Sequence, residues 1–312
     1  MTESRASTEV LAALDCGTNS TRLLVVGARG EILDRQMRVT RLGEGVDTTR
    51  KLSAEAMERT LSVLRDYRES MDAHGVVRAR MAATSAARDA TNSSEFLTAA
   101  KEVTGVEPEL LSGEQEGRLS FRGATSDLPT TSDAAELVVD IGGGSTELVV
   151  GVPGRDESLE ILSLDIGCVR VTERFFLSDP PDSEQVRSAR LAVSEELAKA
   201  RDALGSLTPG HRVIGLAGTV STLGSLSKGI SIYERERVHH LVLTKEQVEW
   251  WLDALASEDT SQRAVRPGMD PGRADVIVGG VLILCEVMSV FDRATCLVSE
   301  ADILDGLVAS LR

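Results

Sequence analysis

The chain has 312 residues, of which 34 are Lys or Arg and 49 are Asp or Glu, so its formal net charge is −15. With 42% hydrophobic and 27% charged residues, the composition is typical of a globular protein, and the length suggests about two domains. The negative charge excludes nucleic-acid or anionic-membrane binding through a broad basic surface. At first sight the same charge also counts against a polyanionic ligand.

The sequence predicts neither a membrane-spanning segment nor a signal for export. No run approaches the roughly 20 apolar residues that cross a bilayer, and residues 1–10, MTESRASTEV, lack a basic region followed by an apolar run. The cysteines form no Cys-x-x-Cys pair, and a chain of this length needs no disulfides to fold; they are Cys16, Cys168, Cys285 and Cys296. We expect buried, reduced thiols and a cytoplasmic location.

The first predicted element is a β-hairpin. Residues 15–26 read DCGTNSTRLLVV and place a Gly-rich turn beside an apolar run. Apolar residues three and four positions apart predict helices over 53–75 and 93–105. A strand is expected between these helices, over 76–83.

A second hairpin follows a polar stretch at 123–135, which we interpret as the domain boundary. Residues 140–150 read DIGGGSTELVV and directly follow an apolar run. The later elements are helices over 183–205, 244–255 and 274–291, and strands over 213–218 and 294–299. The helix over 274–291 is apolar nearly all round, so we expect it in the core rather than in a membrane. Alternating strands and helices predict an α/β fold.

The two hairpins form an internal repeat. Their spacing exceeds the 20–50 residues of solenoid repeats, so it indicates a duplicated domain with one copy in each lobe. Matching residues at fixed offsets make a chance likeness improbable. The aligned pairs are Asp15 with Asp140, Gly17 with Gly142, Ser20 with Ser145, Thr21 with Thr146, and Arg22 with Glu147.

The hairpin tips, GTNST and GGGST, suit phosphate binding. Their backbone N–H groups, hydroxyls and amide offer short-range donors to phosphate oxygens, and glycine allows a ligand to approach the backbone closely. One such tip alone is more often an ordinary turn. Two matched tips, each beside an aspartate, favour a phosphate site.

Three acids flank these tips, and they predict a divalent cation. Asp15, Asp140 and Glu147 would repel a bound phosphate unless a cation lay between them. Mg²⁺ is typically held by one or two carboxylates, water and phosphate oxygens, so Mg²⁺ or Mn²⁺ is expected at Asp140 and Glu147, with Asp15 in reach. The alternative for each Asp is a turn cap.

Further candidates lie outside the hairpins. Arg88 sits among small residues after the strand over 76–83, where it can face a phosphate or simply be solvated. Glu114 and Glu116 lie just inside a helix start, where acids also favour the helix dipole; spacing alone does not decide between that role and catalysis. The four histidines form no ligand-spaced cluster, and no P-loop, G-x-S-x-G or H-E-x-x-H motif occurs.

Together these motifs resemble the exopolyphosphatase and guanosine pentaphosphate phosphatase (Ppx/GppA) family. The segments occur in order along nearly the whole chain: LDCGTNSTRLLVV, ATSAARDATN, SGEQEGRL, VVDIGGGSTELVV, GLAGT and RADVIVGG. The resemblance implies the fold of the actin, sugar kinase and Hsp70 superfamily, with two ribonuclease-H-like lobes and the active site between them. The lobes are then expected at about 1–125 and 126–300, with a last helix at about 301–312 returning to the first lobe.

Site roles are implied residue by residue. Glu116 matches the position of the catalytic base, and Asp140 and Glu147 match metal-associated acids. The phosphate-binding positions are Thr18, Asn19, Ser20, Arg22, Arg88, Gly143, Gly144, Ser145 and Thr146. A run reading DILDGL, residues 302–307, stands where many members have Arg-Glu-Gly-Leu, and it lacks the arginine that could contact a phosphate there.

The function implied is exopolyphosphatase, with hydrolysis of terminal phosphate by a water that Glu116 activates. Guanosine pentaphosphate 5′-phosphatase is the alternative within the family, and an ATP-dependent kinase or ATPase of the same superfold is the alternative outside it. The chain stops where longer relatives carry a helical domain, so shorter polyphosphates are the expected substrates. A monovalent cation such as K⁺ and a homodimer are further expectations by analogy.

This resemblance changes the meaning of the net charge of −15. The negative charge excludes binding by a broad basic surface. It still allows a phosphate to be recognised locally by backbone N–H groups, Arg22, Arg88 and a divalent cation. A short chain that binds by its end suits such a protein.

Overall fold

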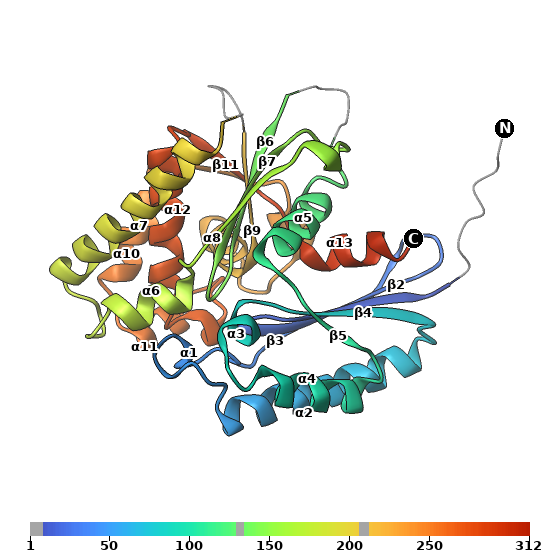
Figure 1. Cartoon of the computed structure of the whole chain (residues 1–312). Coiled ribbons are helices and arrows are strands. Elements are labelled where there is room, and N and C mark those ends of the chain that lie inside the picture. Colours follow the sequence, from blue (N-terminus) through green and yellow to red (C-terminus); the bar gives the residue numbers. More distant parts are fainter. Residues whose placement is uncertain (1–8, 129–133, 206–211) are drawn as a thin grey trace. The chain divides into compact units, whose positions relative to one another are not determined.

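A computed structural model describes residues 9–128, 134–205 and 212–312. These residues form two compact units (Figure 1). The first unit runs to Ser112 and also takes in Ile303–Arg312, and the second unit is Gly113–Asp302. Residues 1–8, where no leader is expected, lie outside the described residues. So do residues 129–133, in the middle of the polar stretch at 123–135.

The first unit is built on a five-stranded sheet in the order β3-β2-β1-β4-β5. β1 pairs antiparallel with β2, and β2 with β3, whereas β1, β4 and β5 run parallel. The hairpin predicted at 15–26 is β1 and β2. The strands are β1 (Leu11–Cys16), β2 (Ser20–Val26), β3 (Ile32–Val39), β4 (Arg78–Ala83) and β5 (Pro108–Leu110).

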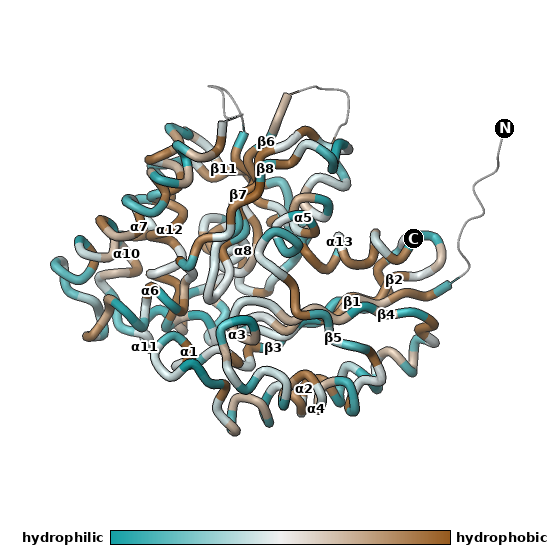
Figure 2. Tube along the Cα trace, viewed as in Figure 1, coloured by the Kyte–Doolittle hydropathy of each residue, from teal (hydrophilic) through white to brown (hydrophobic). Residues whose placement is uncertain are grey.

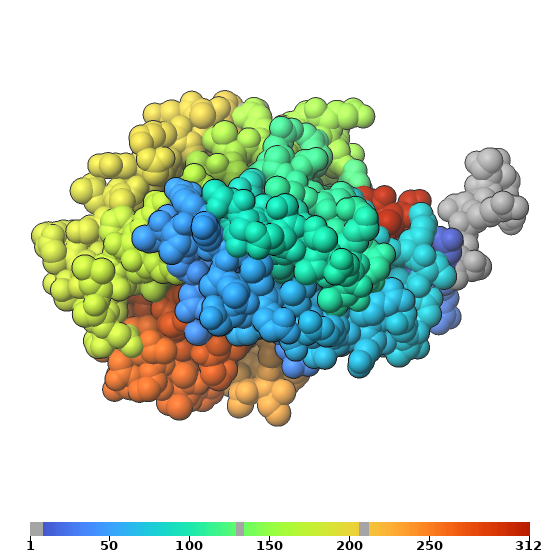
Figure 3. Space-filling view, turned by 60° about the horizontal axis from the view of Figure 1, so that its bottom comes forward, coloured from blue at the N-terminus to red at the C-terminus, as the bar shows by residue number. Residues whose placement is uncertain are grey.

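Helices cover the sheet of the first unit. α2 (Ala54–Ala73) and α4 (Ser93–Thr104) pack against each other, and their outer surface faces the viewer in Figure 3. Their inner sides meet Leu14 and Leu23 in one apolar cluster. The last helix, α13 (Ile303–Ser310), packs against β1, β2 and β4. Two short helices, α1 (Val46–Thr49) and α3 (Ser85–Asp89), complete the unit.

The second unit is built on a six-stranded sheet in the order β10-β11-β9-β6-β7-β8. β6, β9 and β11 run parallel, and β6, β7 and β8 form an antiparallel meander. The strands are β6 (Glu136–Ile141), β7 (Thr146–Gly151), β8 (Glu160–Leu164), β9 (Val213–Leu216), β10 (Val242–Thr244) and β11 (Thr295–Val298).

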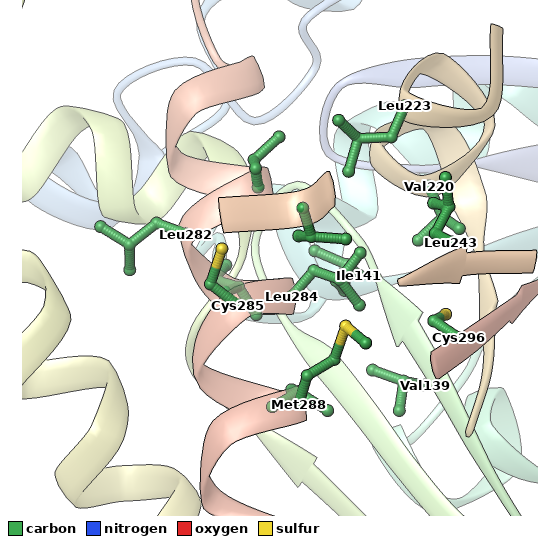
Figure 4. Close-up of a cluster of buried hydrophobic side chains, with 14 of the residues drawn as sticks. Val139, Ile141, Val220, Leu223, Leu243, Leu282, Leu284, Cys285, Met288 and Cys296 are labelled. Atoms are coloured by element: carbon green, nitrogen blue, oxygen red, sulfur yellow. The ribbon is translucent and has the colours of Figure 1, made fainter. Parts of the chain in front are cut away.

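The second unit has a helix layer on each face of its sheet. α5 (Gly113–Ala124) packs on β6, β7 and β8, where Phe121 meets Val138 and Val149. The other face carries the main core, in which α12 lies beside Val139 and Ile141 (Figure 4). The further helices are α6 (Cys168–Phe175), α7 (Ser183–Ala203), α8 (Ala217–Lys228), α9 (Arg235–Val238), α10 (Lys245–Ala256), α11 (Thr260–Ala264), α12 (Ile277–Val290) and the 3₁₀ turns η1 (Asp156–Ser158) and η2 (Pro271–Arg273).

The duplicated fold is confirmed by topology. If β10 is left out of the count, the strands of the second unit repeat the order third-second-first-fourth-fifth, with β8-β7-β6-β9-β11 in the places of β3-β2-β1-β4-β5. The extra strand β10 extends one edge. Each unit therefore has the predicted ribonuclease-H-like sheet. α5 groups with the second unit, whereas the sequence-based boundary at 125 assigned it to the first lobe.

Two of the predicted helices, α2 and α10, begin at side chains that cap their first N–H groups. Ser53 accepts a hydrogen bond from the Ala56 N–H ahead of α2, and Thr244 and Gln247 form a capping box at α10. α12 has 14 residues, and the 12 from Ile277 to Met288 are buried, as expected. Hydrophobic colour covers much of α12, β6 and β7 in Figure 2. Among the described residues, no helix combines the length and apolar character that crossing a membrane requires. All four cysteines are buried and free.

Candidate active site residues

The two hairpin tips are closed in the same way. The Gly17 N–H donates to the Ser20 carbonyl at 3.0 Å, and the Gly142 N–H donates to the Ser145 carbonyl at 3.0 Å. A side chain on Gly17 or Gly142 would press on that carbonyl oxygen, so glycine suits both turns. The sequence repeat therefore reflects one turn geometry used twice.

The paired residues below the tips differ between the copies. Asp15 faces Arg22 across β1 and β2, and Arg22 donates to Asp15 Oδ2 through Nε at 3.0 Å and Nη2 at 2.7 Å. Asp140 faces Glu147 in the same register across β6 and β7. The first pair is thus neutral overall. The second places two buried acids side by side, with 7% and 1% exposure.

The tip of the first unit presents buried polar atoms. The hydroxyl of Thr18 and the amide of Asn19 are buried and have no protein hydrogen-bond partner in the described part of the chain. The Ser85 hydroxyl, at the start of α3, has the same status. Burying such groups without a partner costs about 1–3 kcal/mol each, so this cluster suits a ligand that accepts hydrogen bonds.

Each tip is braced by the segment after the third strand of its sheet. In the first unit, the N–H groups of Thr40 and Arg41 donate to the Asn19 carbonyl, and the N–H of Gly43 donates to the Thr18 carbonyl. In the second unit, the start of α6 donates to the Gly142 and Gly143 carbonyls, and buried Arg170 donates to the Gly144 carbonyl at 2.7 Å. The carbonyls are therefore turned toward protein donors.

The second tip keeps backbone donors for a ligand. Within the described residues, the N–H groups of Gly143 and Gly144 have no protein acceptor. Ser145 is buried at the end of the tip. Thr146 uses its hydroxyl to hold the Ile166 carbonyl at 2.6 Å, so its side chain supports the turn. Ser20 is the first residue of β2.

Helix α5 carries both candidate bases, and they have different surroundings. Glu114 is exposed and forms a 3.2 Å ion pair with Arg118 one turn away. Glu116 is buried, with 9% exposure. It lies one turn before Ser120, whose hydroxyl donates to Asp140 Oδ2 at 2.6 Å. Residues four apart on a helix share a face, so Glu116 lies on the side of α5 that meets the acid pair.

Arg88 belongs to helix α3, and its guanidinium forms a hydrogen bond with the backbone of a neighbouring segment. Its Nη1 donates to the Leu111 carbonyl at 2.8 Å. That bond fixes the guanidinium beside the peptide segment that leads to α5. Its role as a phosphate ligand stays a prediction.

A divalent cation fits the Asp140–Glu147 pair better than the Asp15–Arg22 pair. Carboxylate oxygens are the ligands that Mg²⁺ prefers, and two facing buried carboxylates repel each other unless a cation or proton intervenes. Each accepts a serine hydroxyl, Ser120 for Asp140 and Ser163 for Glu147. Asp15 already has a cationic partner, so its predicted metal role stays a prediction.

One further group of ligand atoms comes together in the second unit. Side-chain atoms of Asp127, His239 and His240 lie within 4.8 Å of one another, although their positions along the chain show no ligand spacing. His239 Nδ1 accepts the Glu300 N–H at 3.0 Å, so the ring proton is on Nε2, which lies 2.6 Å from Asp127 Oδ2. With Nε2 acting as donor, this arrangement is a hydrogen-bonded support rather than a metal site.

Comparison with known proteins decides the family. Residues 25–311 match the Ppx/GppA phosphatase family. The chain belongs to this family.

Its relatives cover it almost completely. Exopolyphosphatase 2 of Mycobacterium tuberculosis is 42% identical over 319 aligned positions, which span 96% of this chain and 98% of that protein. The crystal structure of an exopolyphosphatase-like protein superposes with a TM-score of 0.90 at 34% identity, covering 97% and 98% of the two chains. The Ppx/GppA protein of Aquifex aeolicus gives a TM-score of 0.79 at 32% identity, covering 97% of each.

Membership of the Ppx/GppA family confirms the resemblance and the fold expected from the sequence. The structure adds residues that the sequence did not single out, namely Ser85, Ser120, Ser163 and Arg170. Ser85 could have been noticed, because it follows a strand parallel to β1 in the same segment as Arg88. The others depend on contacts between distant segments.

Proposed function

We propose that this protein is an exopolyphosphatase that releases orthophosphate from the end of inorganic polyphosphate. The observation that carries the proposal is the buried acid pair Asp140–Glu147 beneath a helix that carries buried Glu116. A relative of 42% identity is named Exopolyphosphatase 2, and it aligns over nearly the whole chain. Together they support hydrolysis of a phosphoric anhydride.

Glu116 is the proposed general base. It takes a proton from water while the water oxygen bonds to the terminal phosphorus, and the bond from phosphorus to the bridging oxygen breaks. The shortened chain leaves with the bridging oxygen and its electron pair. Such base catalysis contributes typically about 10²–10⁴-fold. Glu114 is a poorer candidate because it is exposed and paired with Arg118.

Asp140 and Glu147 are the proposed holders of Mg²⁺ or Mn²⁺. When bound, a divalent cation offsets charge on phosphoryl oxygens. The two carboxylates supply hard oxygen donors, and the serine hydroxyls on them fix their orientation. A requirement for K⁺ is a further expectation, which rests on family analogy alone.

The tips are the proposed phosphate-binding elements. In the first unit, Thr18, Asn19 and Ser85 offer buried polar groups. In the second unit, Gly143 and Gly144 offer backbone N–H groups. Several donors at fixed positions suit the terminal phosphates of a chain. Because the net charge is −15, a long polyanion lying across the surface is disfavoured, and short chains are the proposed substrates.

The remaining expectations concern surroundings and partners. We place the protein in the cytoplasm, a location that suits its four free cysteines. We expect neither nucleic acid nor membrane as a partner, because the net charge has the wrong sign. A homodimer stays a prediction by analogy.

One assay separates the candidate activities. Purified protein is incubated with short polyphosphate, long polyphosphate, guanosine pentaphosphate or ATP, each with Mg²⁺ and with a chelator, and orthophosphate is measured. We expect the fastest release from short polyphosphate, and only with Mg²⁺. Release mainly from guanosine pentaphosphate would identify the alternative family activity. Release mainly from ATP would overturn the proposal in favour of an ATPase.

A further inference from the structure

Three residues form a row across the sheet of the second unit. Asp140 on β6 is the register partner of Glu147 on β7, and Glu147 is the register partner of Ser163 on β8. Register partners on antiparallel strands lie on the same face of the sheet. The Ser163 hydroxyl donates to Glu147 Oε1 at 2.7 Å. The row therefore links a serine at its edge to the two acids.

Helix α5 lies across this row, with one residue over each strand. Gly113 contacts Ser163 so closely that any Cβ would collide with it, and a Cβ on Gly117 would lie 3.6 Å from Glu147 Cβ. Ser120 donates its hydroxyl to Asp140. Positions 113, 117 and 120 share one helix face. Their span, about seven residues or about 10.5 Å, matches two strand spacings of about 4.8 Å.

We propose that Ser120 and Ser163 are positioning residues that hold Asp140 and Glu147 for a divalent cation. This inference rests on the proposed function. Each hydroxyl binds one carboxylate oxygen, at 2.6 Å for Ser120 and 2.7 Å for Ser163. A donor on one oxygen restricts rotation of the carboxylate.

The contrast with the first unit shows why serine is suited to this task. At the equivalent register, Arg22 orients Asp15 but also neutralises it. Serine is an uncharged donor, so it orients Asp140 or Glu147 without itself neutralising the carboxylate. Ser120 is fully buried at 0% exposure, which removes water as a competing donor at that carboxylate.

The test compares Ser120→Ala, Ser163→Ala and a control, Thr125→Val. Thr125 is buried just past the end of α5, and its hydroxyl donates to the Phe121 carbonyl at 2.8 Å. The control therefore removes a buried hydroxyl that bonds the helix backbone and leaves both acid contacts in place. Mn²⁺ affinity is measured by electron paramagnetic resonance of free Mn²⁺, and the rise in Tm with added Mg²⁺ is measured in parallel.

We expect both serine variants to bind Mn²⁺ about 10–100-fold more weakly, as for other groups that support metal ligands, and to show a smaller rise in Tm with Mg²⁺. Thr125→Val should bind as the unchanged protein does, even if its Tm in the absence of metal is lower. Unchanged Mn²⁺ affinity in both serine variants would overturn the proposal, as would equal weakening in Thr125→Val.

The failure of the proposed function has a different signature. If the unchanged protein binds Mn²⁺ and the serine variants bind it weakly, the positioning role stands even when no polyphosphate is hydrolysed. If Asp140→Asn leaves Mn²⁺ binding unchanged, the cation is not held by this pair, and the positioning role falls whatever the activity.

Discussion

Asp140 and Glu147 face each other in register across β6 and β7, and both side chains are buried. At the same register of the first sheet, an ion pair stands in their place. Two copies of one hairpin have thus acquired opposite electrostatics. One pairs an acid with a base, and the other places two acids side by side.

Glu116→Gln should abolish most turnover and leave the fold unchanged. The amide keeps the shape of the side chain but accepts no proton from water, so phosphate release should fall about 10²–10⁴-fold. The control is Glu114→Gln, which changes an exposed acid on the same helix. Steady-state phosphate release measures turnover, and Tm checks folding. Equal activity of the two variants would contradict the assignment of the base.

Arg22→Met should destabilise the first unit, because it leaves the Asp15 carboxylate buried without its cationic partner. Breaking such a pair costs about 3–5 kcal/mol, and the 16% exposure of Arg22 suggests the lower end. The double variant Asp15→Asn with Arg22→Met should recover part of that loss, as urea unfolding can show. No recovery would mean that Arg22 stabilises the fold by other contacts.

Gly117→Ala should lower activity by lifting α5 from the sheet. The new Cβ would lie 2.7 Å from Ile161 Cγ2 and 3.0 Å from Val149 Cγ2. Overpacking costs about 1–3 kcal/mol, which offsets the gain of about 1 kcal/mol from replacing a helical glycine. Gly205→Ala serves as the control, since its Cβ would meet open space. A more stable and fully active Gly117→Ala protein would refute this account.

Glu286→Gln should change the pH dependence of stability. Burial raises the pKa of Glu286 on α12 above its usual value, against the opposing effect of Arg190. The folded state therefore holds this proton more tightly than the unfolded chain, and that contribution is lost as pH rises through the raised pKa. Glutamine stays neutral, and Arg190 keeps Glu249 as a partner.

Urea unfolding should accordingly show the Glu286→Gln variant gaining stability relative to the unchanged protein near neutral pH, with the gap closing below about pH 4, where both side chains are neutral. Glu184→Gln should show no such gain, because hydrogen bonding to Arg187 lowers the pKa of this exposed carboxylate on α7, and losing its charge lowers stability near neutral pH if it acts at all. A constant gap at all pH values would show that titration of Glu286 is not its cause.

Local sequence patterns, such as helix caps and hairpin turns, predicted much of the fold. The cap at Ser53 and the capping box at Thr244 each lie within a few residues of the helix that they begin. The hairpin repeat likewise predicted both tips, and the structure then showed the register that pairs Asp140 with Glu147. Strands β3, β5, β8 and β10 were not foreseen, because they are short or half-exposed edge segments whose apolar pattern is weak.

Residues close together in the chain decide turns and register, so the amino-acid order was enough to establish two copies of one Gly-rich hairpin with acids beside both. The amino-acid order could not establish that Arg22 forms an ion pair with Asp15. Nor could it establish that Ser120 of α5 contacts Asp140, or that Glu116 and not Glu114 lies on the side of α5 that faces the acids. Those outcomes depend on which helix face packs on which strands. Burial of apolar surface and close approach at Gly113 and Gly117 settle that choice, and both arise only when segments distant in the chain meet in the folded protein.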